Sequence, residues 1–120
     1  MNKPVIDMDT KAKDIIDKLL QQYLANTEIW VYGSRIKGTA KRYSDLDLVA
    51  FASVEQVPAL FALREAFEES DLPFRVDLFR WDDVPEQFQR NIKREKIVWN
   101  KLQTSAINGF FRLVIIEISH

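Results

Sequence analysis

Asp45 and Asp47 stand at the start of an apolar run that continues to Phe51, and a single leucine separates them. In an extended strand, side chains at positions i and i+2 point to the same face, about 6.5 Å apart. The two carboxylates would therefore aim at one place. Carboxylate oxygens are hard ligands of the kind that Mg²⁺ prefers, so the pair is a candidate for binding metal ions that accompany phosphates.

A glycine-serine dipeptide, Gly33-Ser34, precedes this pair and ends a strand-like run. Gly33 permits a positive φ and lets the backbone approach a phosphate without a Cβ in the way. Ser34 offers a hydroxyl and an N–H to phosphate oxygens, at the start of a short helical turn that Gly38 closes. A turn of this kind beside paired carboxylates predicts a Mg²⁺-nucleotide site, and the chemistry that it favours is nucleotidyl transfer.

Several cations lie between the two halves of this predicted site, namely Arg35, Lys37, Lys41 and Arg42. A solvated loop is the usual explanation of such a charge run. Its position between the glycine turn and the carboxylates indicates instead that at least one cation contacts a triphosphate. The candidates are Arg35 and Lys37, either of which could neutralise a leaving pyrophosphate.

A third carboxylate, Asp77, lies on a later strand-like run that begins at Arg75. A surface ion pair with Arg75 is the simpler explanation of this aspartate taken alone. The glycine-serine dipeptide, the aspartate pair and the third aspartate together resemble the signature of the DNA polymerase β-like nucleotidyltransferases. The resemblance covers roughly residues 28–102. In its short length the chain is similar to the smallest branch of that family, the minimal nucleotidyltransferases or MNT proteins.

The resemblance implies how such a site would work. Two Mg²⁺ ions, about 3.5–4 Å apart, would neutralise the reacting phosphates, with Asp45 and Asp47 binding both ions. Asp77 would bind the ion nearer the acceptor hydroxyl and help to remove its proton. The nucleotide, ATP, would be bound by the glycine turn and the cations that follow it: Gly33, Ser34, Arg35 and Lys37.

No motif identifies the acceptor, and the length of the chain is the main indication. We expect a chain of 120 residues to form a single domain, without room for the acceptor-binding domain of larger family members. MNT proteins of this size are typically paired with a helical HEPN protein that resembles an RNase toxin. The resemblance therefore implies an antitoxin that transfers AMP from ATP to a tyrosine of that partner.

Two alternatives remain open. The chain could be a non-catalytic binding module that neutralises its partner by contact, with the nucleotidyltransferase fold as its scaffold. It could also be an adenylyltransferase that acts on a small molecule or an RNA end. A net charge of −1, from 17 basic and 18 acidic residues, argues against an extended nucleic acid as a partner.

Composition excludes several other kinds of site. The chain has no cysteine, which excludes disulfides and thiolate metal sites. Its single histidine is His120, which argues against histidine-based catalysis and histidine-rich zinc sites. No apolar run reaches the roughly 18 residues that a membrane-spanning helix needs. The N-terminal residues contain no apolar signal-peptide core, so we expect a cytoplasmic protein without a membrane partner.

The predicted elements alternate between helix and strand, which favours an α/β fold, here an α+β sandwich. We expect a small mixed β-sheet with helices on one face and the carboxylates on the open face. In chain order the predictions are a helix over 10–25, strand 28–32, helical turn 34–38, strand 45–51, helix 58–70, strand 74–79 and a helix from near Val84. In the last helix, Phe88, Ile92 and Trp99 are expected to point inward.

The predicted nucleotidyltransferase domain spans residues 1–102. A C-terminal extension over 103–120 follows it and contains an apolar run over 110–118 with strong strand propensity. This run could form an edge strand or dock against a partner, because an apolar strand edge left bare would be prone to aggregation.

Overall fold

A computed structural model of the protein describes residues 6–99, so the two roles predicted for the extension over 103–120 lie outside the described residues. The described elements, in chain order, are α1 (Thr10–Leu24), β1 (Ile29–Tyr32), α2 (Ser34–Lys37), β2 (Leu46–Ala50), the 3₁₀ turn η1 (Val54–Gln56), α3 (Val57–Glu68), β3 (Val76–Arg80), the 3₁₀ turn η2 (Trp81–Asp83), α4 (Glu86–Glu95) and β4 (Ile97–Val98).

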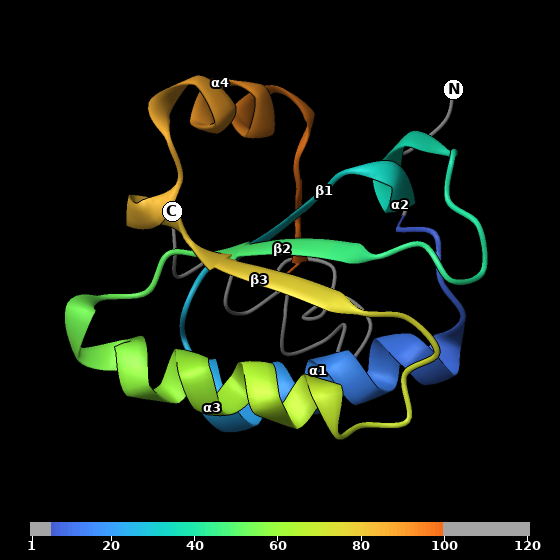
Figure 1. The fold of residues 1–120 in the computed structure, drawn as a ribbon, viewed down its shortest axis with the longest axis horizontal. Helices are drawn as coiled ribbons and strands as arrows, with labels where there is room; N and C mark the ends of the chain where they lie inside the picture. The colour runs from blue at the N-terminus through green and yellow to red at the C-terminus, as the bar shows by residue number, and fades with distance from the viewer. Residues whose placement is uncertain (1–5, 100–120) are drawn as a thin grey trace, which may run out of the picture.

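The strands form one mixed sheet in the order β3-β2-β1-β4, which confirms the predicted fold class (Figure 1). β2 and β3 are parallel because α3 crosses over between them, whereas β1 is antiparallel to both of its neighbours. β4 was not predicted, since the last helix was expected to carry Trp99. α4 instead ends at Glu95, and the chain pairs Ile97 with Val31 on the free edge of β1.

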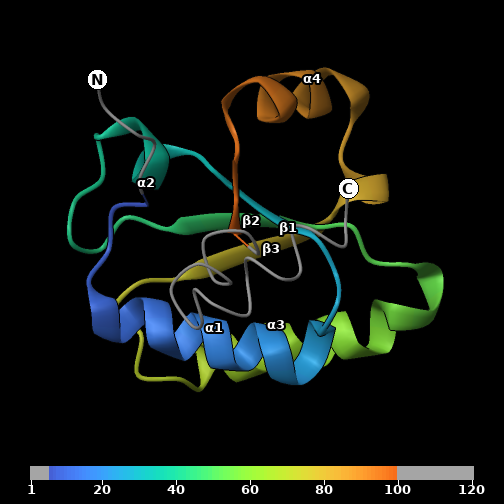
Figure 2. The same ribbon diagram turned by 180° about the vertical axis from the view of Figure 1, so that it is seen from behind.

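One face of the sheet is covered by α1 and α3, which lie side by side (Figures 1 and 2). α1 begins at the N-cap Asp9, whose side chain accepts a hydrogen bond from the Ala12 N–H at 2.8 Å. Alternation along β2 buries Leu46 and Leu48 completely against these helices. The same alternation turns Asp47, the residue between them, toward the other face of the sheet.

α4 stands on the opposite side of the sheet from α1 and α3, so the expectation of helices on one face holds for those two helices only (Figure 1). Ile92 is its only buried residue, and a helix this polar cannot form a core layer. Phe88, which was expected to point inward, is 52% exposed. Trp99 is buried as expected, and its Nε1 donates to Oδ1 of Asp17 at 3.0 Å.

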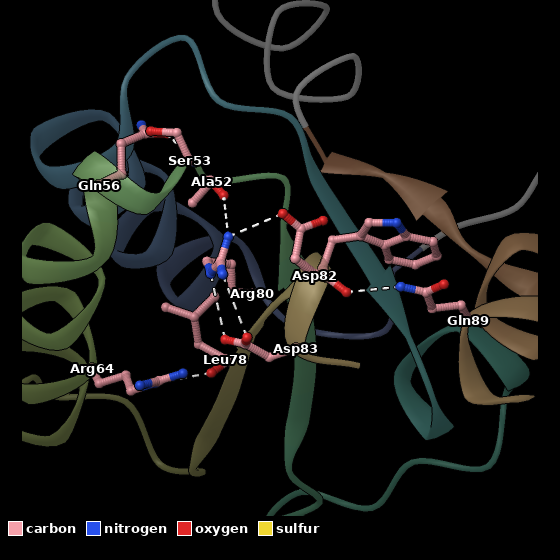
Figure 3. A network of polar contacts seen from close by, with 10 residues as sticks. Ala52, Ser53, Gln56, Arg64, Leu78, Arg80, Asp82, Asp83 and Gln89 are labelled. Atoms are coloured by element: carbon pink, nitrogen blue, oxygen red, sulfur yellow. Dashed lines mark hydrogen bonds and ion pairs between the residues drawn. The ribbon is translucent and has the colours of Figure 1, made fainter. Parts of the chain in front are cut away.

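A polar network at the end of β3 holds the start of α4 in place (Figure 3). The side chain of Arg80 is only 13% exposed and pairs with both aspartates of η2, at 3.1 and 3.4 Å. Its Nη1 also donates to the Ala52 carbonyl at 3.2 Å. The Trp81 carbonyl accepts a hydrogen bond from Nε2 of Gln89 on α4 at 2.9 Å. These contacts link β3, η2 and α4, and so fix the helix above the sheet.

Within residues 6–99, none of the helices combines the length and the apolar character that crossing a membrane requires.

Candidate active site

The predicted carboxylates come together on the sheet face that lies away from α1 and α3. Asp47 of β2 is directly opposite Asp77 of β3 in the parallel pair. It is also directly opposite Tyr32 of β1 in the antiparallel pair. Directly opposite residues share a face of the sheet, so these three side chains form a row across three strands. Asp45 lies outside this row, two residues before Asp47 and just ahead of β2, and its Oδ2 accepts a hydrogen bond from Nη2 of Arg75.

Two side chains of the row, Asp47 and Tyr32, have raised pKa values. Burial, together with the nearby charges of Asp77 and Asp45, raises the pKa of Asp47 from 3.8 to about 6. Burial and the charges of Asp47 and Asp77 likewise raise the pKa of Tyr32 to about 12. The shifts mean that the row stabilises an added cation and that the Tyr32 hydroxyl stays protonated at neutral pH. Tyr32 was missed in the sequence, although alternation with the buried Val31 places it on this face.

Arg75 is the cation that touches the carboxylates in this structure. Its Nη2 lies 3.1 Å from Oδ2 of Asp45, and its Nε lies 3.2 Å from Oδ1 of Asp77. The Arg75 side chain is 69% exposed. The ion pair between Arg75 and Asp77, which was the simpler explanation of Asp77, is therefore present. Because Arg75 also pairs with Asp45, this ion pair is part of the carboxylate cluster.

The donor set has the chemistry of a Mg²⁺ site, because its side chains offer carboxylate oxygens, which are hard ligands, from two adjacent strands. As the side chains stand, however, no group of three or more acidic or histidine residues within the described part of the chain is arranged to hold a metal ion. Arg75 occupies oxygens of Asp45 and Asp77. A metal ion bound through these same oxygens would compete with this guanidinium.

Gly33 is packed directly against the carboxylate of Asp47. Its φ of +87° is one that residues with a side chain rarely adopt, and an added Cβ would collide with Oδ2 of Asp47. Ser34 follows as the first residue of α2, which Gly38 ends with a φ of +74° as predicted. The glycine turn and the aspartate pair are separate motifs in the sequence. In the structure they touch each other, through Gly33 and Asp47.

The structure does not bring Arg35 to the carboxylates. Its side chain is 4% exposed and points into the loop, where it donates to carbonyl oxygens of Asp7 at 2.7 Å, Arg42 at 2.9 Å and Ser44 at 2.8 Å. Its guanidinium also lies 4.0 Å from the centre of the Phe74 ring. We therefore assign Arg35 to holding the loop that leads into the first aspartate, in place of the predicted nucleotide contact.

Lys37, the other predicted cation, stays at the surface of the site. Its Nζ pairs with Oε1 of Glu95 on α4 at 3.2 Å, and both side chains are about half exposed. An exposed pair of this kind contributes little stability and opens easily. Lys37 therefore remains the candidate for neutralising a phosphate.

A cavity of about 680 Å³ lies between α4 and this face of the sheet. Its lining residues come from β1, α2, β3 and α4 and the turn before it: Tyr32, Gly33, Lys37, Phe79, Asp83, Val84, Pro85, Phe88, Asn91, Ile92 and Glu95. The cavity thus adjoins the glycine turn and, through Tyr32, the β1 end of the row. Trp81 does not line it and packs instead in an aromatic cluster with Trp30 and Phe51.

Known proteins that are similar to this chain are described as nucleotidyltransferases or protein adenylyltransferases. The family model described as "Polymerase beta, Nucleotidyltransferase" matches residues 14–103. "Probable protein adenylyltransferase MntA" of Haemophilus influenzae is 43% identical over 95 residues, which cover 78% of this chain and 82% of that protein. "Protein adenylyltransferase MntA" of Thermococcus cleftensis is 32% identical over 82 residues, which cover 67% of this chain and 81% of that protein.

A solved structure has a similar fold. It is described as "Crystal structure of the toxin-antitoxin with AMP-PNP", and it matches with a TM-score of 0.58 over 88% of this chain and 90% of that chain. Its sequence identity of 19% makes the likeness one of fold alone. Since the family model matches most of the chain and a relative is 43% identical, the chain belongs to the polymerase β-like nucleotidyltransferase family, as one of its minimal members.

Proposed function

We propose that this chain transfers the AMP group of ATP to a tyrosine hydroxyl of a partner toxin of the HEPN type, and so acts as an antitoxin in the cytoplasm. The observation that carries the proposal is the row of Asp47 and Asp77 with Gly33 packed against it. The names of the two relatives, both protein adenylyltransferases, support the reaction. The solved toxin–antitoxin structure with AMP-PNP supports a toxin as the partner and an adenine nucleotide as the substrate.

In this proposal Asp45, Asp47 and Asp77 would hold two Mg²⁺ ions, in competition with the guanidinium of Arg75. When bound, the ions supply positive charge beside the reacting phosphates and the leaving group. Hard carboxylate oxygens suit such ions. The proposal includes the metal because Asp47 and Asp77 lie directly opposite each other and Asp45 lies two residues before Asp47.

Each of the other site residues has its own role in this proposal. Gly33 lets the triphosphate approach the backbone, and Ser34 and Lys37 bind the phosphates that become pyrophosphate. Asp77, at the side of the row where Arg75 is exposed, accepts the proton of the acceptor hydroxyl. The acceptor oxygen bonds to the α-phosphorus while the bond to pyrophosphate breaks.

The test is intact-mass spectrometry of the protein incubated with its operon neighbour, ATP and Mg²⁺. We expect the neighbour to gain the mass of AMP, and Asp47→Asn to abolish the gain. Asp14→Asn is the matched control, because Asp14 is an exposed aspartate of α1 that pairs only with Lys18 in the described structure, at 3.1 Å. An unchanged neighbour, in a complex that still neutralises the toxin with Asp47→Asn, would overturn the proposal in favour of the binding module.

A further inference from the structure

Arg35 is deeply buried for a charged residue, with an exposed fraction of only 4%. Burying a guanidinium is costly unless its nitrogen atoms find partners. All three nitrogens of Arg35 donate to backbone carbonyl oxygens, and these carbonyls belong to two separate segments of the chain. A buried cation that is paired in this way fixes the course of the backbone around it. The segments that it fixes therefore indicate its role.

The first of these segments leads into Asp45. The carbonyl of Ser44, the residue directly before Asp45, accepts hydrogen bonds from Nε at 3.0 Å and from Nη2 at 2.8 Å. Nη2 also donates to the carbonyl of Arg42 at 2.9 Å. This carbonyl lies within a turn that the Ser44 N–H closes onto the Lys41 carbonyl at 3.0 Å. The backbone is therefore held up to the peptide group that joins Ser44 to Asp45.

The same guanidinium touches the segment that leads into Asp77. It lies 4.0 Å from the centre of the Phe74 ring, and Phe74 is itself buried. Phe74 comes directly before Arg75, whose carbonyl accepts the Leu46 N–H at 2.9 Å and so joins the starts of β2 and β3. Attraction between a cation and an aromatic face keeps the two together. Arg35 therefore links the two segments from which the aspartate-bearing strands begin.

The segment before α1 closes the other side of the guanidinium. The carbonyl of Asp7 accepts a hydrogen bond from Nη1 at 2.7 Å, and the Asp7 N–H donates to the Arg35 carbonyl at 2.6 Å. A lysine could not reproduce this arrangement, because its compact ammonium lacks the planar fork that reaches carbonyls on two sides and stacks on a ring. The position therefore requires arginine.

Asp45 depends on this support more than the other two aspartates do. Asp47 and Asp77 are held directly opposite each other by the parallel pair, and Gly33 packs against Asp47. The paired residues of β2 begin only at Leu46, and the Asp45 side chain is 42% exposed. The place of the Asp45 carboxylate is therefore set by the peptide group before it, which is the group that Arg35 holds.

We propose that Arg35 is a positioning residue for AMP transfer, which acts through Asp45 by fixing the place of that carboxylate relative to Asp77. The inference rests on the proposed function and adds to it a residue outside the proposed contacts with nucleotide and metal. Without Arg35, the residues proposed to bind phosphates are still present, so ATP binds while one reacting group is misplaced. A misplacement of about 1 Å is enough to lower a rate about a hundredfold.

The first measurement is the rate of AMP transfer to the operon neighbour, followed by intact-mass spectrometry over a range of ATP concentrations. We expect Arg35→Lys to lower the rate at saturating ATP about a hundredfold and to change KM for ATP by less than about threefold. An Arg35→Lys protein with a normal rate would overturn the proposal.

Arg64→Lys is the matched control for this measurement. Nε of Arg64 also donates to a backbone carbonyl, that of Leu78 at 2.9 Å (Figure 3), and its guanidinium also lies beside a phenylalanine ring, that of Phe61. Arg64 lies on α3, away from the segment before Asp45, so we expect it to transfer AMP as the unaltered protein does. Equal losses of rate in the two variants would overturn the proposal.

The second measurement asks whether Arg35 acts through Asp45, and it needs no acceptor. Electron paramagnetic resonance gives the affinity for Mn²⁺, in place of Mg²⁺, of the unaltered protein, Arg35→Lys, Asp45→Asn and the double variant. We expect Arg35→Lys to weaken Mn²⁺ binding in the unaltered background and to have no effect once Asp45 is replaced, because the two changes then remove one interaction. Equal weakening in both backgrounds would mean that Arg35 supports the fold in general, and would overturn the proposal.

Phe74→Leu tests the same arrangement if Arg35→Lys does not fold. It removes the ring from the guanidinium but keeps an apolar side chain, and we expect a rate about tenfold lower with little change in KM. An unchanged rate in this variant would overturn the proposal. If the unaltered protein binds Mn²⁺ but transfers no AMP, the proposed function fails, while the Mn²⁺ affinities still decide whether Arg35 positions Asp45.

Discussion

The two faces of the central sheet are made by the same strands and have opposite energetics. On the face covered by α1 and α3, Val31 and Leu48 are fully buried, and their removal from water favours folding. On the other face, Asp47 and Asp77 lie directly opposite each other, and burial makes the ionised form of Asp47 unfavourable. One face therefore stabilises the fold, while the other holds charge that the fold must tolerate.

Residues that stabilise the fold and residues that could take part in the chemistry lie on different faces of the sheet. Because side chains alternate along a strand, each strand of the site has its core residues within one position of its site residues. Variants on the core face should lower stability without altering the chemistry of the folded protein. Variants on the site face should do the reverse, and some of them should raise stability.

The largest change in stability is expected on the core face. Leu48→Ala should lower the free energy of unfolding by about 2–5 kcal/mol, because it leaves a cavity in a fully buried position. Urea unfolding measures this, and Phe61→Ala at an exposed position is the control, expected to change stability by less than about 0.5 kcal/mol. ATP binding by folded Leu48→Ala should stay normal. Loss of ATP binding without loss of stability would contradict the division between the faces.

Gly33 is where the turn meets the site face, and Gly33→Ala should affect both properties. The positive φ and the collision with Oδ2 of Asp47 should lower stability by about 1–3 kcal/mol and displace the carboxylate, so that AMP transfer is lost. Gly38→Ala is the matched control, since Gly38 has a similar φ of +74° but nothing within 4 Å of an added Cβ. It should lose some stability and keep its activity. Equal losses of activity in both variants would show that backbone strain alone matters.

On the site face, Asp47→Asn should raise the stability of the metal-free protein. Asp47 ionises near pH 3.8 when unfolded and near pH 6 when folded, so the folded state binds the proton more tightly. Its favourable contribution is present below pH 3.8 and is lost as the pH rises through about 6. After allowance for solvent screening, we expect Asp47→Asn to be more stable by about 1 kcal/mol at pH 7.5 and equal near pH 3.5. Thermal unfolding in EDTA across this pH range measures the difference, and a less stable variant at pH 7.5 would contradict it.

The smallest effect is expected at Arg75. Because its guanidinium pairs with Asp45 and Asp77, Arg75→Gln should raise the affinity for Mn²⁺, a spectroscopic substitute for Mg²⁺, by about threefold, since exposed ion pairs are weak. Electron paramagnetic resonance of free Mn²⁺ measures this. Arg90→Gln is the control, because Arg90 is similarly exposed and pairs with Glu86 on α4. Weaker Mn²⁺ binding by Arg75→Gln would mean that Arg75 organises the aspartates instead of competing for them.

Local spacing in the sequence was sufficient to predict most of the elements and the direction of the site side chains. Alternation along the strands placed Asp47 on the face opposite Leu46 and Leu48, and the structure has it there. The same rule could have identified Tyr32 from the buried Val31 beside it. These features depend on backbone geometry within a few residues, and that geometry is a property of the local sequence.

Only the tertiary structure decided which residues meet across larger separations. Arg35 and Lys37 lie two positions apart in the same charge run, yet one is buried among loop carbonyls and the other is half exposed beside the site. The position of α4, the pairing of β4 with β1 and the register that sets Asp47 opposite Asp77 also depend on contacts between distant segments. The sequence by itself determined the chemistry of the side chains and the faces of the strands that carry them. Their burial and their partners were decided by packing, because the free energy of a buried or paired group depends on neighbours that local spacing does not specify.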